Sequence, residues 1–190
     1  MKILMPCLLI GLLAPTIALA APRLVTDPDA PRALAGDGPV QVDWTDPARF
    51  TELAHSGNRW QAARGNWVHD LASHLVNTAN TRLPEGQQLS VTITDIDLAG
   101  DYEPWRGPRH ADIRMLRDIY PPRIRLQYTL RDAGGQVLDQ QEAVLSDMGY
   151  LRSTASPRMR NQSLPYEKRM IDNWLHQLLP AGNAQASARR

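Results

Sequence analysis

Cysteine is almost absent from this chain of 190 residues: Cys7, close to the amino terminus, is the only one. It lies in a segment that we expect to be removed from the mature protein. The remaining chain then has no thiol, which excludes disulfide bonds, thiol catalysis and a cysteine-ligated zinc site. The core must therefore be stabilised by the packing of side chains alone.

An excess of charge of either sign is also missing. Loss of Lys2 with the amino-terminal segment leaves 20 basic and 20 acidic residues, and this neutrality argues against a nucleic-acid-binding protein, which would be strongly basic. Phenylalanine occurs once, as Phe50, whereas tryptophan and tyrosine occur five times each. We therefore expect amphipathic aromatics in the core, with hydrogen-bond partners for their polar atoms.

Recognisable catalytic motifs are missing as well. The chain has no Gly-x-Ser-x-Gly nucleophile elbow, no Walker loop, no dinucleotide-binding glycine pattern and no His-Glu-x-x-His. We therefore expect no cofactor and no metal ion, and no residue can be named as catalytic. A hydrolase whose site is assembled only by the fold stays open as a third functional hypothesis.

A cleavable export signal is the clearest feature that is present. Lys2 gives a positive start, residues 3–19 form an uncharged apolar run, and residues 18–20 (Ala-Leu-Ala) match the small-x-small pattern of a signal peptidase site. Cleavage between Ala20 and Ala21 would make the protein periplasmic or secreted. No later segment is apolar enough to span a bilayer, so we expect no integral membrane segment after cleavage.

The composition beyond the signal indicates one domain with irregular ends. Residues 21–38, rich in proline, alanine, glycine and aspartate, are expected to form an extended leader, and residues 180–190 a disordered tail. Residues 39–179 are long enough to bury one hydrophobic core. We therefore predict a signal peptide over residues 1–20 and a single α+β domain over residues 39–179.

Hydrophobic periodicity predicts the elements of that domain. Alternating residues indicate strands over 40–44, 89–98, 123–131 and 136–146, and apolar residues at helical spacing indicate helices over 46–57, 59–82, 112–119 and 165–178. In the helix over 59–82, Trp60 and Trp67 fall on the face expected to be buried. The pattern predicts a two-layer α+β sandwich: a mostly antiparallel sheet of about four strands with two main helices on one face.

The second predicted strand contains a phase slip. Leu89, Val91 and Ile93 alternate with polar residues, but the next apolar residues are Ile96 and Leu98. One extra residue in a strand inverts the facing of every residue after it. We therefore predict a β-bulge near residue 95.

The motifs within these elements resemble a proteobacterial family of exported domains of unknown function, numbered three thousand and sixteen, over residues 40–178. The resemblance implies a periplasmic protein of a Gram-negative bacterium and carries no activity that could be transferred. It rests on residues 42–47 (VDWTDP) with Phe50, 83–86 (LPEG), 91–100 (VTITDIDLAG), 103–107 (EPWRG), 117–124 (RDIYPPRI), 166–168 (YEK) and 174–175 (WL).

Two charged blocks in the middle of the chain contain the candidate ligand-binding residues. The first block holds four carboxylates whose oxygens could bind Ca²⁺, although their spacing is not that of an EF-hand loop. The second block is rich in arginine and could bind an anionic glycan, with two aromatic rings beside it. The two blocks could instead only pair with each other. The candidate residues are Asp95, Asp97, Asp101, Glu103, Trp105, Arg106, Tyr120, Arg123 and Arg125.

Two hypotheses therefore precede the hydrolase. The first is a non-catalytic binding or accessory module of the cell envelope, which would contact an envelope protein or an anionic glycan through the polar sheet face or an exposed edge strand. The alternative is a binder of a small ligand, anion or divalent ion centred on residues 95–125.

Overall fold

The structure is a computed structural model that describes residues 23–152 and 162–180. The expected signal peptide, most of the loop after residue 152 and the carboxyl-terminal tail lie outside the described residues. The strands are β1 Val40–Trp44, β2 Gln88–Asp97, β3 Asp101–Tyr102, β4 Arg114–Met115, β5 Arg123–Arg131 and β6 Val137–Ser146. The helices are η1 Pro47–Arg49, α1 Thr51–Ala54, α2 Arg59–Ala62, α3 Trp67–Asn80, η2 Pro104–Arg106 and α5 Pro165–Leu178.

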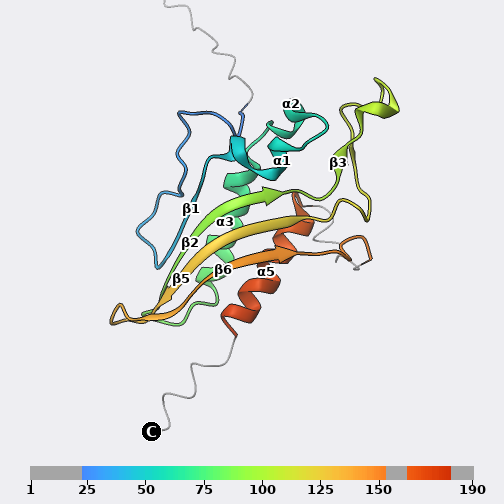
Figure 1. Cartoon of the computed structure of the whole chain (residues 1–190). Helices are drawn as coiled ribbons and strands as arrows, with labels where there is room; N and C mark the ends of the chain where they lie inside the picture. Colours follow the sequence, from blue (N-terminus) through green and yellow to red (C-terminus); the bar gives the residue numbers. More distant parts are fainter. Residues whose placement is uncertain (1–22, 153–161, 181–190) are drawn as a thin grey trace, which may run out of the picture.

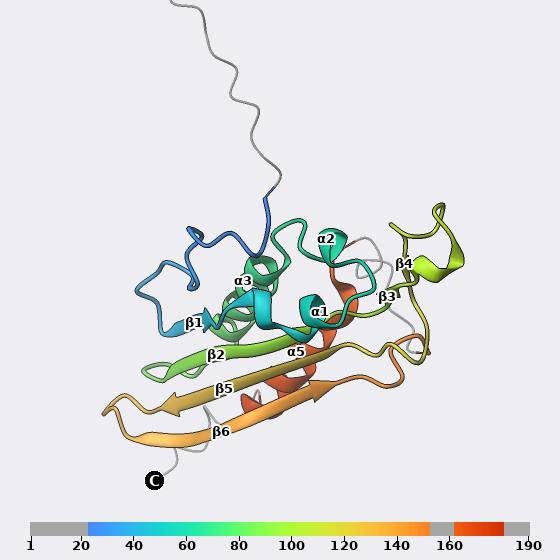
Figure 2. The same cartoon turned by 45° about the horizontal axis from the view of Figure 1, so that its top comes forward.

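A four-stranded mixed sheet forms one layer of the fold, in the order β1-β2-β5-β6. Strand β1 runs parallel to β2, which requires a crossover through α3, and the other neighbours are antiparallel. Helices α3 and α5 pack together on one face of this sheet (Figures 1 and 2). The predicted α+β class, with two main helices on one face of a mostly antiparallel sheet, is confirmed.

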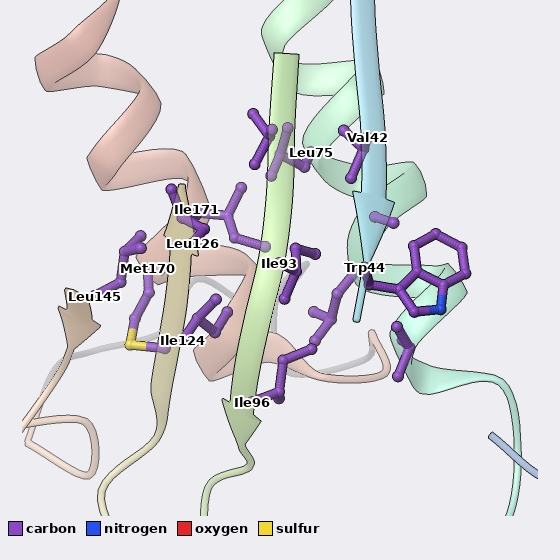
Figure 3. Close-up of a cluster of buried hydrophobic side chains, with 14 of the residues drawn as sticks. Val42, Trp44, Leu75, Ile93, Ile96, Ile124, Leu126, Leu145, Met170 and Ile171 are labelled. Carbon is purple, nitrogen blue, oxygen red and sulfur yellow. The ribbon is translucent and has the colours of Figure 1, made fainter. Parts of the chain in front are cut away.

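The core lies between the sheet and these two helices. Inward-facing aliphatic residues of β2 and β5, such as Ile93 and Leu126, meet Leu75 of α3 and Ile171 of α5 (Figure 3). Each of these four side chains is almost fully buried. The opposite face of the sheet carries the polar residues of the alternating pattern.

The predicted bulge in β2 is confirmed, and it determines which charges lie together. The register between β2 and β5 shifts between Ile93 and Asp95. After the shift, Ile96 pairs with Ile124 in the core, whereas Asp95 is opposite Arg125 and Asp97 is opposite Arg123. Both carboxylates therefore lie on the outer face at the end of the strand.

The single helix predicted over residues 59–82 is wrong, because the chain breaks into α2 and α3 at Gly65. This residue has a φ of 94°, a left-handed conformation that glycine adopts without strain. Trp67 is buried, and its indole N–H donates to the carbonyl of Ala62 at 2.9 Å. Trp60 is instead 62% exposed, with the Arg64 guanidinium 4.7 Å from its ring centre, so its assignment to the core is also wrong.

The short helix predicted over residues 112–119 is absent. Arg114 and Met115 form strand β4, which pairs with β3 in a small second sheet. Tertiary contacts override the local pattern here, because the side chain of Arg114 reaches into the interior to a buried carboxylate.

The described part of the leader packs on the domain. Leu34 N donates to the carbonyl of Val42, and Trp44 N donates to that of Arg32, so residues 32–34 run along the outer edge of β1. Val25 and Leu34 also contact the core. Within residues 23–152 and 162–180, no helix is both long and apolar enough to cross a membrane.

Candidate functional site

A cavity of about 230 Å³ lies where β2 ends, beside α1 and the segment that leads into β5. The elements that form it are far apart in the sequence and are joined by hydrogen bonds described below. Its lining residues come from α1 and the turn after it, from the end of β2 and the start of β3, and from the start of β5. They are Thr51, Glu52, His55, Ser56, Asp97, Leu98, Gly100, Asp101, Ile119, Tyr120, Pro121 and Arg123.

Glu52 is the best-buried carboxylate of this cavity, with 3% of the residue exposed. It accepts a hydrogen bond from Leu98 N at 3.0 Å and forms a two-pronged ion pair with Arg114. Arg114 Nη1 also donates to the carbonyl of Gly100 at 2.6 Å. Burial raises the pKa of Glu52 to about 7, against the opposing effect of the Arg114 charge. The pair joins α1 to β4 and holds the wall of the cavity in place.

Asp97 differs from its neighbours because no hydrogen bond or ion pair to it is found within the described part of the chain. Asp95 accepts from the backbone N–H and the hydroxyl of Thr51, at 2.6 and 2.7 Å. Asp101 accepts from Gly57 N and from Tyr102 N, at 3.3 and 2.7 Å. Asp97 therefore faces the cavity with its acceptor capacity free.

The surroundings of Asp97 disfavour its charged form. Burial is the main cause, and the nearby carboxylate of Asp95 adds to it, so the pKa of Asp97 rises to about 6 in spite of the Arg123 guanidinium. A positive charge close to Asp97 would offset both effects and favour its ionised form. Perturbed carboxyl groups in a concave site are a common mark of a binding or catalytic centre.

Glu103 and its arginines form a separate ion-pair cluster next to the cavity. Glu103 Oε2 lies 2.6 Å from Arg106 Nε and 3.0 Å from Arg117 Nη2, in ion pairs whose geometry is not that of a hydrogen bond. Glu103 Oε1 accepts from the hydroxyl of Tyr120 at 3.1 Å. Since Glu103 is buried, these partners compensate its charge and fold the loop after β3 onto the domain.

The structure thus distributes the nine sequence-predicted residues over four settings. Asp97, Asp101, Tyr120 and Arg123 line the cavity. Asp95 and Arg125 face each other on the sheet beside the cavity, with 3.9 Å between Asp95 Oδ2 and Arg125 Nε. Glu103 and Arg106 belong to the ion-pair cluster. Trp105 is 69% exposed on η2 and is not part of the cavity.

Sequence reasoning missed the contribution of α1 and β4 to the cavity. Glu52 lies in a short helix next to a buried leucine, and its arginine partner is 62 residues away. No local spacing connects the two. The one available signal was the charge itself, because Glu52 directly precedes the buried Leu53 and a carboxylate there needs a partner.

The contacts within the cavity bear on the calcium and hydrolase hypotheses. Over the described ranges, no group of three or more His, Cys, Asp or Glu side chains is arranged to hold a metal ion. Ser56 Oγ lies 3.4 Å from Asp101 Oδ1, and no hydrogen bond between Ser56 and His55 is found among the described residues. Among the described residues, the cavity therefore shows an unpaired carboxylate, Asp97, and no hydroxyl paired with a histidine.

The contact of the last helix with the same region completes the site. Glu167, in the first turn of α5, is 2% exposed, and its side chain accepts from Ala99 N at 2.7 Å. Burial raises the pKa of Glu167. This contact fixes the backbone between β2 and β3, immediately behind the cavity.

Comparison with known proteins gives a family for the chain. The family described as "Protein of unknown function (DUF3016)" matches residues 38–177, a range that contains every element from β1 to α5 apart from the last residue of that helix. No curated protein and no solved structure matches the chain. Because the match covers well over half of its length, the chain belongs to the DUF3016 family.

Proposed function

We propose that this protein is an exported binding module of the bacterial cell envelope, and that its cavity holds a small ligand with a protonated amine. The observation that carries the proposal is Asp97, a partly buried carboxylate that lines the cavity and has no protein partner among the described residues. A buried charge is costly unless it is paired, so such a group is suited to recognise a charge of opposite sign.

The balance of charge in the cavity favours a cation over an anion. Asp97 and Asp101 both line it, whereas Arg123 is the one arginine among the lining residues described above. Arg114, next to the cavity, is already engaged by Glu52. An anion at Arg123 would lie close to two carboxylates, whereas an ammonium group at Asp97 would meet an attractive potential.

Replacement of Asp97 with asparagine should abolish the binding of small amines. A diamine such as putrescine or an amino sugar such as glucosamine should raise the melting temperature of the unaltered protein at pH 8, because a ligand of the native state stabilises it. At pH 5 the carboxyl group with a pKa of about 6 is about nine-tenths protonated, so the affinity should fall about tenfold. The measurement is a thermal melt series in each amine at both pH values.

The matched control is Asp43→Asn, which removes an exposed carboxylate of β1 that does not line the cavity. This variant should keep the full response to amines. Equal responses of the two variants, or a response to phosphate and none to amines, would refute the cationic-ligand proposal.

The exported location has its own support and its own test. The charged start, the apolar run over residues 3–19 and the Ala-Leu-Ala pattern at residues 18–20 support export with cleavage. In a Gram-negative host, protein recovered from the periplasm should begin at Ala21 in amino-terminal sequencing. An Ala20→Asp variant should be left uncleaved, because the peptidase site requires a small residue there. Recovery of the unaltered chain from the cytoplasm with Met1 intact would contradict export, without bearing on the cavity.

A further inference from the structure

The two edges of the main sheet are covered to different extents. Residues 32–34 donate to and accept from the outer edge of β1. At the other edge, the backbone hydrogen bonds found for β6 in the described residues are those to β5. Figure 2 shows β6 as the outermost strand, with α5 behind it. A strand of 10 residues with a free edge is a template for pairing with another strand.

Two apolar side chains of β6, which are not buried within this chain, are exposed to solvent. Leu138 is 50% exposed and Val144 is 54% exposed. Val144, opposite Arg125, lies on the polar face of the sheet, and Leu138 lies at the β-bulge where the register with β5 shifts; the two flank Gln140 and Glu142. Neither side chain belongs to the core cluster.

The spacing of these residues is symmetric about Gln141. If β6 pairs in the antiparallel direction with β6 of a second copy, and Gln141 lies opposite Gln141 of that copy, then Leu138 lies opposite Val144. The same register places Gln140 opposite Glu142, a pair that can form a hydrogen bond. Asp139 then lies opposite Ala143. A two-fold axis makes each of these contacts twice.

The neighbouring registers are less favourable. A continuous sheet requires residues of the same face to be opposite each other, so one strand can slide past the other only by an even number of residues. Each slide by two residues moves the centre of the two-fold symmetry by one residue. Centring on residue 142 places two Glu142 carboxylates together, and centring on residue 139 does the same for Asp139. Centring on residue 140 places Leu138 opposite the charge of Glu142. Like charges that are directly opposite destabilise a strand pair.

We infer that β6 pairs with β6 of a second copy of this chain in the register centred on Gln141, to give a continuous eight-stranded sheet. The carrying observation is that, among the registers compared, this one alone places the exposed Leu138 opposite the exposed Val144 and brings no like charges together. An interface made by one strand pair is small, so we expect a dimer that dissociates in the micromolar range.

A charge-pair rescue in the full chain tests both the dimer and its register. Leu138→Lys and Val144→Glu, made singly, should each weaken dimerisation at least tenfold in sedimentation equilibrium, because each places a charge against an apolar residue. The double variant should dimerise again, since the lysine introduced in one copy then pairs with the glutamate introduced in the other, twice in each dimer. Within one chain the two positions are about 20 Å apart along the strand, so they cannot pair internally.

A cross-link gives an independent readout. Gln141→Cys should form an interchain disulfide on mild oxidation, because directly opposite residues have Cα atoms within the range that a disulfide spans. Glu142→Cys, whose two copies are offset, is the control, and the unaltered chain controls for Cys7. A monomer at all concentrations up to about 500 µM, a double variant as weak as the single ones, or equal cross-linking of both cysteine variants would overturn the inference.

Discussion

Replacing Glu52 with alanine should lower the free energy of unfolding by about 3–5 kcal/mol at pH 8, where the carboxyl group with a pKa of about 7 is mostly ionised. The change leaves the Arg114 guanidinium without its carboxylate and Leu98 N without its acceptor. Uncompensated charge in a buried position is one of the few causes of so large an effect. Urea unfolding followed by circular dichroism gives the value.

Glu85→Ala is the matched control, because Glu85 is exposed in the turn before β2 and should change the stability by less than about 0.5 kcal/mol. If Glu52→Ala is as stable as this control, the Glu52–Arg114 pair does not hold the cavity wall. In that case the small sheet of β3 and β4 should also keep its place without it.

Replacing Phe50 with alanine should cost about 3–5 kcal/mol, the usual loss for an aromatic side chain removed from a packed core. Phe50 is 1% exposed and lies with its ring centre 6.4 Å from that of Trp67. It anchors the start of α1 against α3, so the loss should also displace Thr51 and Glu52 from the cavity. We therefore expect a lower melting temperature and a weaker response to amines in the same variant.

Trp60→Ala provides the comparison for this variant, since it removes a larger ring from an exposed position. Its contact with Arg64 is a surface cation–π interaction worth about 0.5–1 kcal/mol. Equal losses of stability in Phe50→Ala and Trp60→Ala would contradict the structure, in which Phe50 is buried and Trp60 is exposed.

The layers of the fold could be predicted from the sequence because alternation and helical spacing are local signals. The bulge in β2 was accessible for the same reason: it shifts the apolar residues from odd to even positions within one strand. The break at Gly65 was not, because the apolar spacing continues across it and the contacts that stabilise the turn, such as that of Gly65 N with the carbonyl of Arg23, are tertiary. Helix propensity predicts the end of a helix only weakly where tertiary contacts determine it.

The candidate site could be predicted only in part. The acidic residues at the end of β2 were found because they lie together in the sequence, and Asp97 and Asp101 do line the cavity. Which carboxylates have a hydrogen-bond partner depends on residues that are distant in the sequence. Thr51 donates to Asp95, and Arg114 donates to Glu52 in α1. Which charge stays unpaired is therefore a property of the tertiary structure.

The contact between Glu167 and Ala99 has a consequence for the order of assembly. The backbone behind the cavity is fixed by a side chain that is synthesised 68 residues later, near the end of the domain. The strands of the central hairpin can meet earlier, since β5 and β6 are joined by a short turn. A ribosome-bound fragment that stops before α5 would contain the sheet and yet lack the contact that fixes Ala99, so the cavity is finished only after α5 has been synthesised.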